Sequence, residues 1–101
     1  MARVIVSPYA LADQDEILRY LDREAGFPTA AKYDVAFRAL LSRLAEFPGI
    51  GAPRPGLGDG IRIYVIDPYI VIYEGGQDSD TVIVHRIVHG HRDIQPDLID
   101  R

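Results

Sequence analysis

The sequence predicts an α+β domain in which a helical hairpin packs on a small, mainly antiparallel sheet. Residues 8–47 hold two consecutive stretches whose apolar side chains recur at intervals of three and four, the spacing of amphipathic helices. Residues 61–88 hold three runs rich in β-branched and aromatic side chains, separated by turn residues. With a short apolar strand before the helices, the expected order is β-α-α-β-β-β, followed by a short C-terminal tail.

The first strand and the first helix meet at a capping signal. A short apolar run predicts a strand over Arg3–Ser7. Ser7-Pro8 then starts a helix, because the hydroxyl caps free amides and the fixed φ of proline suits the first helical position. Acidic residues such as Asp13 occupy the early turns, where the helix dipole favours negative charge. We expect this helix to run to about Glu24 and to end at Gly26.

The second helix has the strongest apolar periodicity in the chain. It starts after Phe27-Pro28-Thr29 and ends at Pro48-Gly49. Its periodic apolar positions are Tyr33, Phe37, Leu40, Leu41, Leu44 and Phe47. Residues 48–60 then hold five glycines and three prolines, which predicts an irregular connector. A phosphate-binding loop is rejected for this segment, because no Gly-Lys-Ser/Thr motif follows, no strand precedes it and no helix begins after it.

The remaining elements are strands and a tail. Ile61–Ile66 and Tyr69–Glu74 flank Asp67-Pro68 and predict an antiparallel hairpin. Five of the seven residues in Val82–Val88 are β-branched and apolar, which predicts the central strand of the sheet, covered on both faces. The tail, Ile94–Arg101, is expected to form a helical turn at most, because Pro96 is tolerated only in the first turn of a helix.

Composition predicts one globular domain over residues 1–101, with 48% hydrophobic and 26% charged residues. There is no cysteine, so disulfides and thiolate metal ligands are excluded. The N-terminal apolar run is too short for a signal peptide or a membrane span, and we expect a cytoplasmic protein that does not enter membranes. The formal net charge of −4 argues against direct nucleic-acid binding, which relies on clustered lysines and arginines.

All three histidines lie in residues 85–91, at the end of the predicted central strand. If the strand stays extended, His85, Ile87, His89 and His91 share one face of the sheet. A zinc site built on these histidines is disfavoured, because no carboxylate is clearly placed to support the ligands. The sequence therefore predicts no metal and no cofactor.

Two other uses of these side chains remain open. Metal-free RNA cleavage needs an acid, a base and cations, and it would use His89 or His91 with Arg62 or Arg86 and a nearby tyrosine. A protein-binding surface requires fewer specific residues than catalysis does, because arginine and tyrosine are the residue types that dominate interface hot spots. An arginine within a buried strand, as Arg86 is expected to be, also needs a partner for its charge.

Several motifs together span about residues 3–94. They are Ser7-Pro8, Ala12-Asp13, Ile17-x-x-Tyr20, Leu41-x-x-Leu44-x-x-Phe47-Pro48, Gly51-x-Pro53-Arg54-Pro55-x-Leu57-Gly58-x-Gly60-x-Arg62, Tyr69-Ile70-Val71-Ile72-Tyr73, and Arg86-Ile87-Val88-His89-Gly90-x-Arg92-Asp93-Ile94. In this order they resemble the ParE/RelE toxin superfamily and its ParE-like branch in particular. Gln14 departs from that branch, which more often has an apolar residue there.

This resemblance implies the toxin of a bacterial type II toxin–antitoxin module, held in a hetero-oligomer by a small antitoxin that folds on binding. If the chain is ParE-like, the resemblance implies growth inhibition through DNA gyrase without catalysis, and a role in plasmid stabilisation. If it is RelE-like, the resemblance implies mRNA cleavage on the ribosome. The chain has one lysine, Lys32, no tyrosine after Tyr73 and a negative net charge, and these departures from the RelE-like pattern favour gyrase. A non-toxic member that only binds its partner is the third possibility.

The functional surface is expected where Arg62, Arg86, His89 and Arg92 come together. If the protein is a nuclease, the catalytic candidates are His89, His91, Arg62 and Arg86. The candidates for binding the antitoxin or the target are Arg54, Arg62, Tyr69, Tyr73, Arg86, His89 and Arg92.

Overall fold

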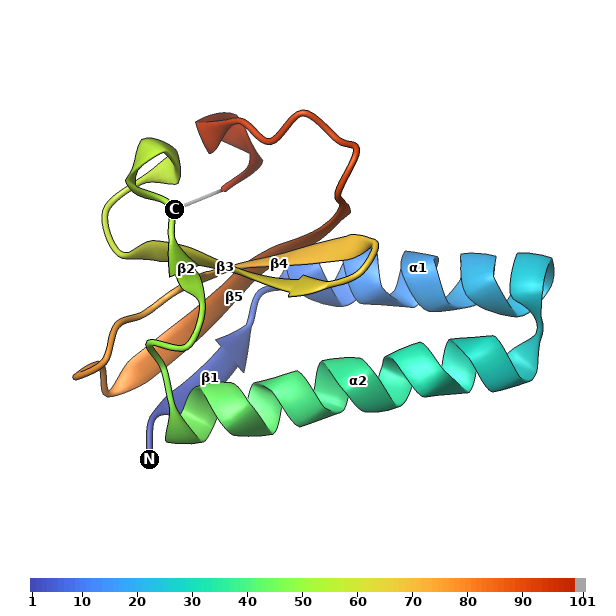
Figure 1. The fold of residues 1–101 in the computed structure, drawn as a ribbon, viewed down its shortest axis with the longest axis horizontal. Helices are drawn as coiled ribbons and strands as arrows, with labels where there is room; N and C mark the ends of the chain where they lie inside the picture. Colours follow the sequence, from blue (N-terminus) through green and yellow to red (C-terminus); the bar gives the residue numbers. More distant parts are fainter. Residues whose placement is uncertain (100–101) are drawn as a thin grey trace.

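The structure is a computed structural model, and it describes residues 1–99. A five-stranded mixed sheet of order β1-β5-β4-β3-β2 carries two antiparallel helices on one face (Figure 1). The predicted α+β class is confirmed. The elements are β1 (Arg3–Val6), α1 (Pro8–Ala25), α2 (Phe27–Glu46), β2 (Ala52–Pro53), β3 (Ile61–Ile66), β4 (Tyr69–Glu74), β5 (Thr81–His89) and the 3₁₀ helices η1 (Pro55–Leu57) and η2 (Pro96–Leu98).

The helical hairpin follows the predicted signals except at the start of its second helix, where Phe27-Pro28-Thr29, expected to precede the helix, form its first turn. The Ser7 hydroxyl accepts a hydrogen bond from the Ala10 amide at 3.0 Å, and Pro8 takes the first helical position. Gly26, at φ 92°, is the single residue between the two helices, and a residue with a Cβ would be strained there. Its N–H donates to the Asp22 carbonyl and its own carbonyl accepts from the Ala30 N–H, each at 3.2 Å. One glycine thus ends the first helix and starts the second.

The sheet differs from expectation in two places. β5 pairs in parallel with β1 and antiparallel with β4, so β4 takes the middle position and the prediction of β5 as the central strand is wrong. Within the connector predicted to be irregular, β2 adds a fifth strand through the pairs Ala52↔Ile63 and Pro53↔Arg62. The edge position suits Pro53, because proline cannot donate to a neighbouring strand.

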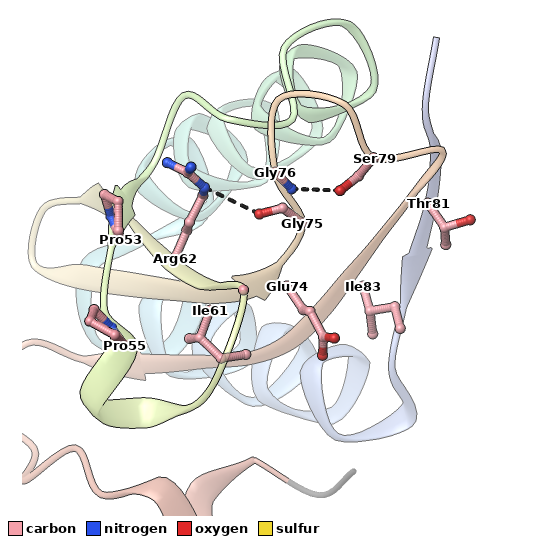
Figure 2. A pocket seen from close by; sticks show the side chains of 11 residues that line it. Pro53, Pro55, Ile61, Arg62, Glu74, Gly75, Gly76, Ser79, Thr81 and Ile83 are labelled. Carbon is pink, nitrogen blue, oxygen red and sulfur yellow. Dashed lines mark hydrogen bonds between the residues drawn. The ribbon is translucent and has the colours of Figure 1, made fainter.

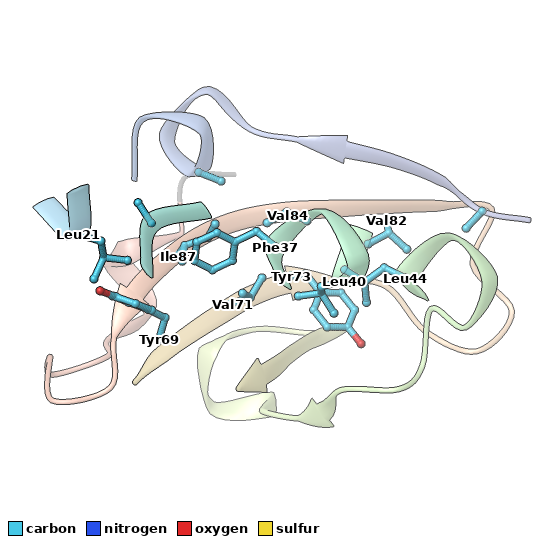
Figure 3. Packing of buried hydrophobic residues seen from close by; sticks show 13 residues of the cluster. Leu21, Phe37, Leu40, Leu44, Tyr69, Val71, Tyr73, Val82, Val84 and Ile87 are labelled. Carbon is cyan, nitrogen blue, oxygen red and sulfur yellow. The ribbon is translucent and has the colours of Figure 1, made fainter. Parts of the chain in front are cut away.

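The main core lies between the helices and the sheet (Figure 3). Phe37, Leu40 and Leu44 of α2 are almost fully buried there. The strands supply the facing side chains, Tyr69, Val71, Tyr73, Val82, Val84 and Ile87. Of the six periodic positions that predicted this helix, all but one pack in the core, as expected for an amphipathic helix; Phe47 lies just after α2 and is exposed, so the prediction is wrong there.

A second, smaller cluster covers the opposite face of the sheet. Ile61, Ile72 and Val88 are buried beneath Leu57 of η1 and Ile99 of the tail. The tail forms one 3₁₀ turn that begins at Pro96, as its sequence predicted; residues 100–101 lie outside the described part of the chain. Among the helices of residues 1–99, none is long and apolar enough to cross a membrane.

A β-bulge in β5 sets the direction of the side chains that follow. Arg86 pairs with Ile72 and Val84 pairs with Tyr73, which leaves His85 as the extra residue. Val84 and Ile87 therefore both reach the helix-side core although they lie three positions apart. The expectation that His85 and Ile87 share a face is wrong, because it assumed unbroken alternation.

Replacing Leu44 by alanine should lower the free energy of unfolding by ~2–5 kcal/mol, because the side chain is fully buried in the main core. Chemical denaturation measures the change. Val35→Ala, on the exposed side of α2, is the matched control and should change stability by less than about 0.5 kcal/mol. Equal losses from both variants would contradict the packing of α2 against the sheet.

Candidate functional site

Arg86, a leading candidate from the sequence, forms an ion pair between β5 and α1. Its Nε and Nη2 atoms donate to the two carboxylate oxygens of Asp13 at 2.7 and 3.0 Å. Both side chains are largely buried, with 18% of Arg86 and 15% of Asp13 exposed. The hydrogen bond to Asp13 raises the pKa of Arg86, against the opposing effect of burial.

The same carboxylate completes the edge of β5. The pairing between β1 and β5 ends at Val6↔Val84, although β5 continues to His89. Beyond that point the Ile87 N–H donates to Asp13 at 2.9 Å, and the Ser7 hydroxyl donates to the His85 carbonyl at 2.8 Å. Two side chains from the start of α1 thus satisfy backbone groups of β5 that the short first strand cannot reach.

Asp13→Ala and Arg86→Ala should each lower the free energy of unfolding by about 3–5 kcal/mol, because each leaves the other charge buried without its partner. The double variant should lose less than the sum of the two. Asp15→Ala is the control: its ion pair with Arg19 is mostly exposed, and its loss should cost less than about 1 kcal/mol. Denaturation of all four variants makes the comparison. Full stability of Arg86→Ala would contradict a structural role for the ion pair.

Arg62 and Tyr73 hold the connector that follows α2. The Arg62 guanidinium donates to the carbonyls of Gly49 and Gly51 at 3.1 and 2.7 Å, and to that of Gly75 at 3.2 Å. The Tyr73 hydroxyl accepts from the Gly51 N–H and donates to the Pro48 carbonyl, each at 2.8 Å. Burial raises the pKa of Tyr73, and the Gly51 hydrogen bond and Arg62 oppose this rise. Arg62 and Tyr73, both predicted site residues, are therefore already hydrogen-bonded to backbone groups of the chain.

Gly51 is required by the same contacts. A Cβ at this position would lie 2.6 Å from the Ile63 carbonyl oxygen and 2.7 Å from the Tyr73 ring. The glycine-rich connector is therefore packed against an arginine and a tyrosine, and its composition reflects close approach of the backbone rather than phosphate binding.

His89 and His91 form a separate group at the far end of β5. The two imidazole rings stack with their centroids 4.9 Å apart, and His89 meets the Tyr69 ring edge-on at 5.9 Å. The His91 and Arg92 amides donate to His89 Nδ1 and to the His89 carbonyl, so the chain turns after His89 rather than staying extended. Burial, followed by the charges of Tyr33 and Tyr20, raises the pKa of the Tyr69 hydroxyl.

These residues border a groove between the helical hairpin and the end of the sheet, which we call the hairpin groove. Its volume is about 1070 Å³. Arginines and tyrosines from α1, α2 and the strand ends line it, together with Asp13, Asp15 and Glu16 of α1. The aromatic and cationic lining residues are Arg19, Tyr20, Arg23, Tyr33, Tyr69, His89 and Arg92.

The structure does not bring all the predicted site residues together. Arg62 lies opposite Tyr73 of β4, and His89 lies opposite Tyr69 of the same strand. Because Tyr69 and Tyr73 are four residues apart, Arg62 and His89 are separated by roughly 13 Å along the strand direction. The expectation that Arg62 lies beside His89 and Arg92 is therefore wrong. Arg54 is exposed at the start of η1, near the Arg62 end.

The three histidines also fail to converge. His85 is buried and its Nε2 lies 2.9 Å from Glu74 Oε1, whereas His89 contacts Tyr69 on the helix side. Across residues 1–99 no group of three His, Cys, Asp or Glu side chains is arranged to hold a metal ion. Of the predicted site residues, Tyr69, His89 and Arg92 line the hairpin groove, and His91 stacks on His89 beside it.

The chain matches a family model described as the ParE toxin of the type II toxin–antitoxin system parDE, over residues 4–94. It belongs to the ParE toxin family. Among curated proteins it is similar to toxin ParE3 of Caulobacter vibrioides, with 28% identity over 97% of this chain and 96% of that protein. Toxin ParE1 of the same organism is 31% identical over 83% of this chain and 84% of its own length.

A solved structure of the chromosomal ParDE toxin–antitoxin system from P. aeruginosa has the same fold. The TM-score is 0.71, at 21% sequence identity, over 88% of this chain and 96% of that one. The likeness shows that the two chains share the arrangement of the strands and the helical hairpin.

Sequence reasoning missed two residues that organise this ParE-family chain. Asp13 looked like a helix-dipole residue, and only its position beside the end of β1 makes it the partner of Arg86. Glu74 was predicted only as the last residue of the strand Tyr69–Glu74, yet its carboxylate contacts the buried His85. The sequence did hold a signal for Asp13. An arginine within an apolar strand needs a carboxylate partner, and the first turns of α1 contain several acidic residues.

Proposed function

We propose that this ParE-family chain is the toxin of a type II toxin–antitoxin module, that it arrests growth by binding DNA gyrase in the cytoplasm, and that a cognate antitoxin neutralises it. Family membership over residues 4–94 carries the proposal. The negative net charge supports a protein target over RNA, because phosphate binding depends on clustered cations.

The geometry supports inhibition by binding rather than by catalysis. Stabilising a phosphorane needs cations free to approach it. Arg86 is held by Asp13, and Arg62 is held by three backbone carbonyls. These two arginines therefore cannot supply charge at the stacked histidines without breaking internal hydrogen bonds.

A second candidate function is ribosome-dependent mRNA cleavage, and a specific observation favours it. His89 and His91 stack at an exposed position beside Arg92, which provides two imidazoles for acid–base chemistry and one cation. The third candidate, a non-toxic member that only binds its partner, requires neither gyrase nor RNA.

Inducing the chain alone in a bacterium distinguishes these functions. We expect filamentation, DNA breaks and an SOS response, with messenger RNA intact, because a gyrase inhibitor damages DNA and leaves translation templates uncut. His89→Ala should then still arrest growth, since no imidazole chemistry is involved. Cleaved messages with intact DNA, lost in His89→Ala, would replace gyrase inhibition by the nuclease function. Normal growth with abundant folded protein would favour the non-toxic member.

We further propose that the hairpin groove seats the antitoxin. Tyrosine and arginine line the groove, and these residue types dominate protein–protein hot spots. Arg92 can pair with an acidic side chain of such a segment, and Tyr20 offers a half-exposed ring for its apolar side chains. Tyr69, His89 and Arg92, expected from sequence to bind a partner, all lie on this groove.

Arg92→Ala and Tyr20→Ala should each weaken binding of the antitoxin encoded beside this gene by about tenfold or more, the loss typical of a hot-spot side chain. Titration calorimetry on the purified complex partners measures the affinity. Arg38→Ala is the matched control, because Arg38 is an exposed arginine of α2 paired with Asp34, outside the lining of the groove. Unchanged affinity in both groove variants would place the antitoxin elsewhere.

A further inference from the structure

The two edges of the sheet differ in whether they can accept another strand. An edge strand exposes unpaired backbone N–H and C=O groups, and proteins often protect it by short length or by proline. β2 has both features, because it consists of two residues and one of them is Pro53. β1, the other edge, has four residues and no proline. Figure 2 shows Pro53 of β2 at one side and, beyond Thr81 and Ile83 of β5, β1 at the other.

Alternate residues of β1 turn their backbone groups toward β5. The N–H groups of Arg3 and Ser7 donate to carbonyls in residues 80–84 at 2.8 and 2.9 Å. Because backbone groups alternate in direction along a strand, the N–H and C=O groups of Val4 and Val6 point to the free edge. Within residues 1–99 these groups have no hydrogen-bond partner. β1 therefore offers two donors and two acceptors to an added strand.

The side chains in and beside β1 also suit burial by another chain. Val4 and Val6 pack partly against the main core, so Ile5 between them points to the opposite face of the sheet, where it is 39% exposed. Met1 and Tyr9, on either side of the strand, are 99% and 53% exposed. Exposed apolar side chains that gather at an unpaired edge indicate a contact with another protein chain.

A second copy of β1 fits this edge by symmetry. In an antiparallel pair, a two-fold axis at Ile5 places Val4 of each copy opposite Val6 of the other, so that all the free backbone groups form hydrogen bonds. The two Ile5 side chains then meet at the axis, and Arg3 lies opposite Ser7, so no like charges face one another. Because β2 cannot accept a strand, copies cannot add head to tail, and the contact closes as a dimer.

From this geometry we infer that the protein forms a two-fold dimer through β1, in which the two sheets join into one continuous sheet with five strands from each copy. Two hydrogen-bonded residue pairs and the apolar contact at Ile5 hold the copies together. Such a small interface is expected to dissociate in the micromolar range. The contact needs neither gyrase nor an antitoxin, so it can be tested separately from the proposed function.

Oxidative cross-linking of Ile5→Cys tests the register. The chain has no cysteine of its own, and the axis brings the Cα atoms of the two substituted positions to about 4.5 Å, within the range of a disulfide. We expect a linked dimer of twice the chain mass of 11.3 kDa. Val65→Cys, at an exposed position of β3, is the matched control and should link only by slow random collision. Folded Ile5→Cys protein that links no faster than Val65→Cys overturns the inference.

Sedimentation equilibrium measures the association of protein made by cell-free synthesis, which growth arrest does not limit. The wild-type chain should show a monomer–dimer equilibrium over micromolar concentrations. Ile5→Lys should raise the dissociation constant by about tenfold or more, because two like charges then meet at the axis. Val65→Lys, which adds the same charge away from β1, should keep the wild-type value. A wild-type monomer at every concentration, or a dimer that Ile5→Lys leaves unchanged, overturns the inference.

Hydrogen exchange of the Val4 and Val6 amides identifies what occupies the edge. We expect both amides to be protected in the wild-type dimer and to exchange freely in Ile5→Lys, because they have no partner within the described chain. The Arg3 amide, which donates to the Asp80 carbonyl, should be protected in both proteins. Protection of Val4 and Val6 only after the antitoxin is added would assign the edge to the antitoxin and overturn the inference.

Discussion

One extra residue in β5 decides where the side chains after Val84 point. Without the bulge at His85, strict alternation would turn Ile87 away from the helices and break the main core. With it, Ile87 and His89 lie on the helix side, and His85 lies beside Glu74 on the other face. The main core, the hairpin groove and the contact between His85 and Glu74 all depend on this single irregularity.

Near the bulge, two side chains form hydrogen bonds with β5 where β1 is too short to pair with it. The first strand is too short to pair with the whole of β5, and Ser7 and Asp13 satisfy the backbone groups beyond its end. Asp13 also neutralises Arg86, so one carboxylate joins the start of α1 to the sheet. This dual role explains why an arginine within a buried strand serves the fold of a ParE-family chain, since its charge is already matched.

The cations of this protein are divided between internal and external roles. Arg62 and Arg86 bind groups within the chain, while Arg19, Arg23 and Arg92 line the hairpin groove. The hairpin groove combines these three arginines with tyrosines and with Asp13, Asp15 and Glu16 of α1.

The sequence alone determined the class of fold, the helical hairpin and the strands, because capping residues, glycines and apolar periodicity are local signals. It also determined the family, through motifs that span most of the chain. Only the tertiary structure decided the strand order, the face of His85 and the partners of Arg62, Arg86 and Glu74. Those features depend on a register shift and on contacts between residues up to 78 positions apart, which no local pattern encodes.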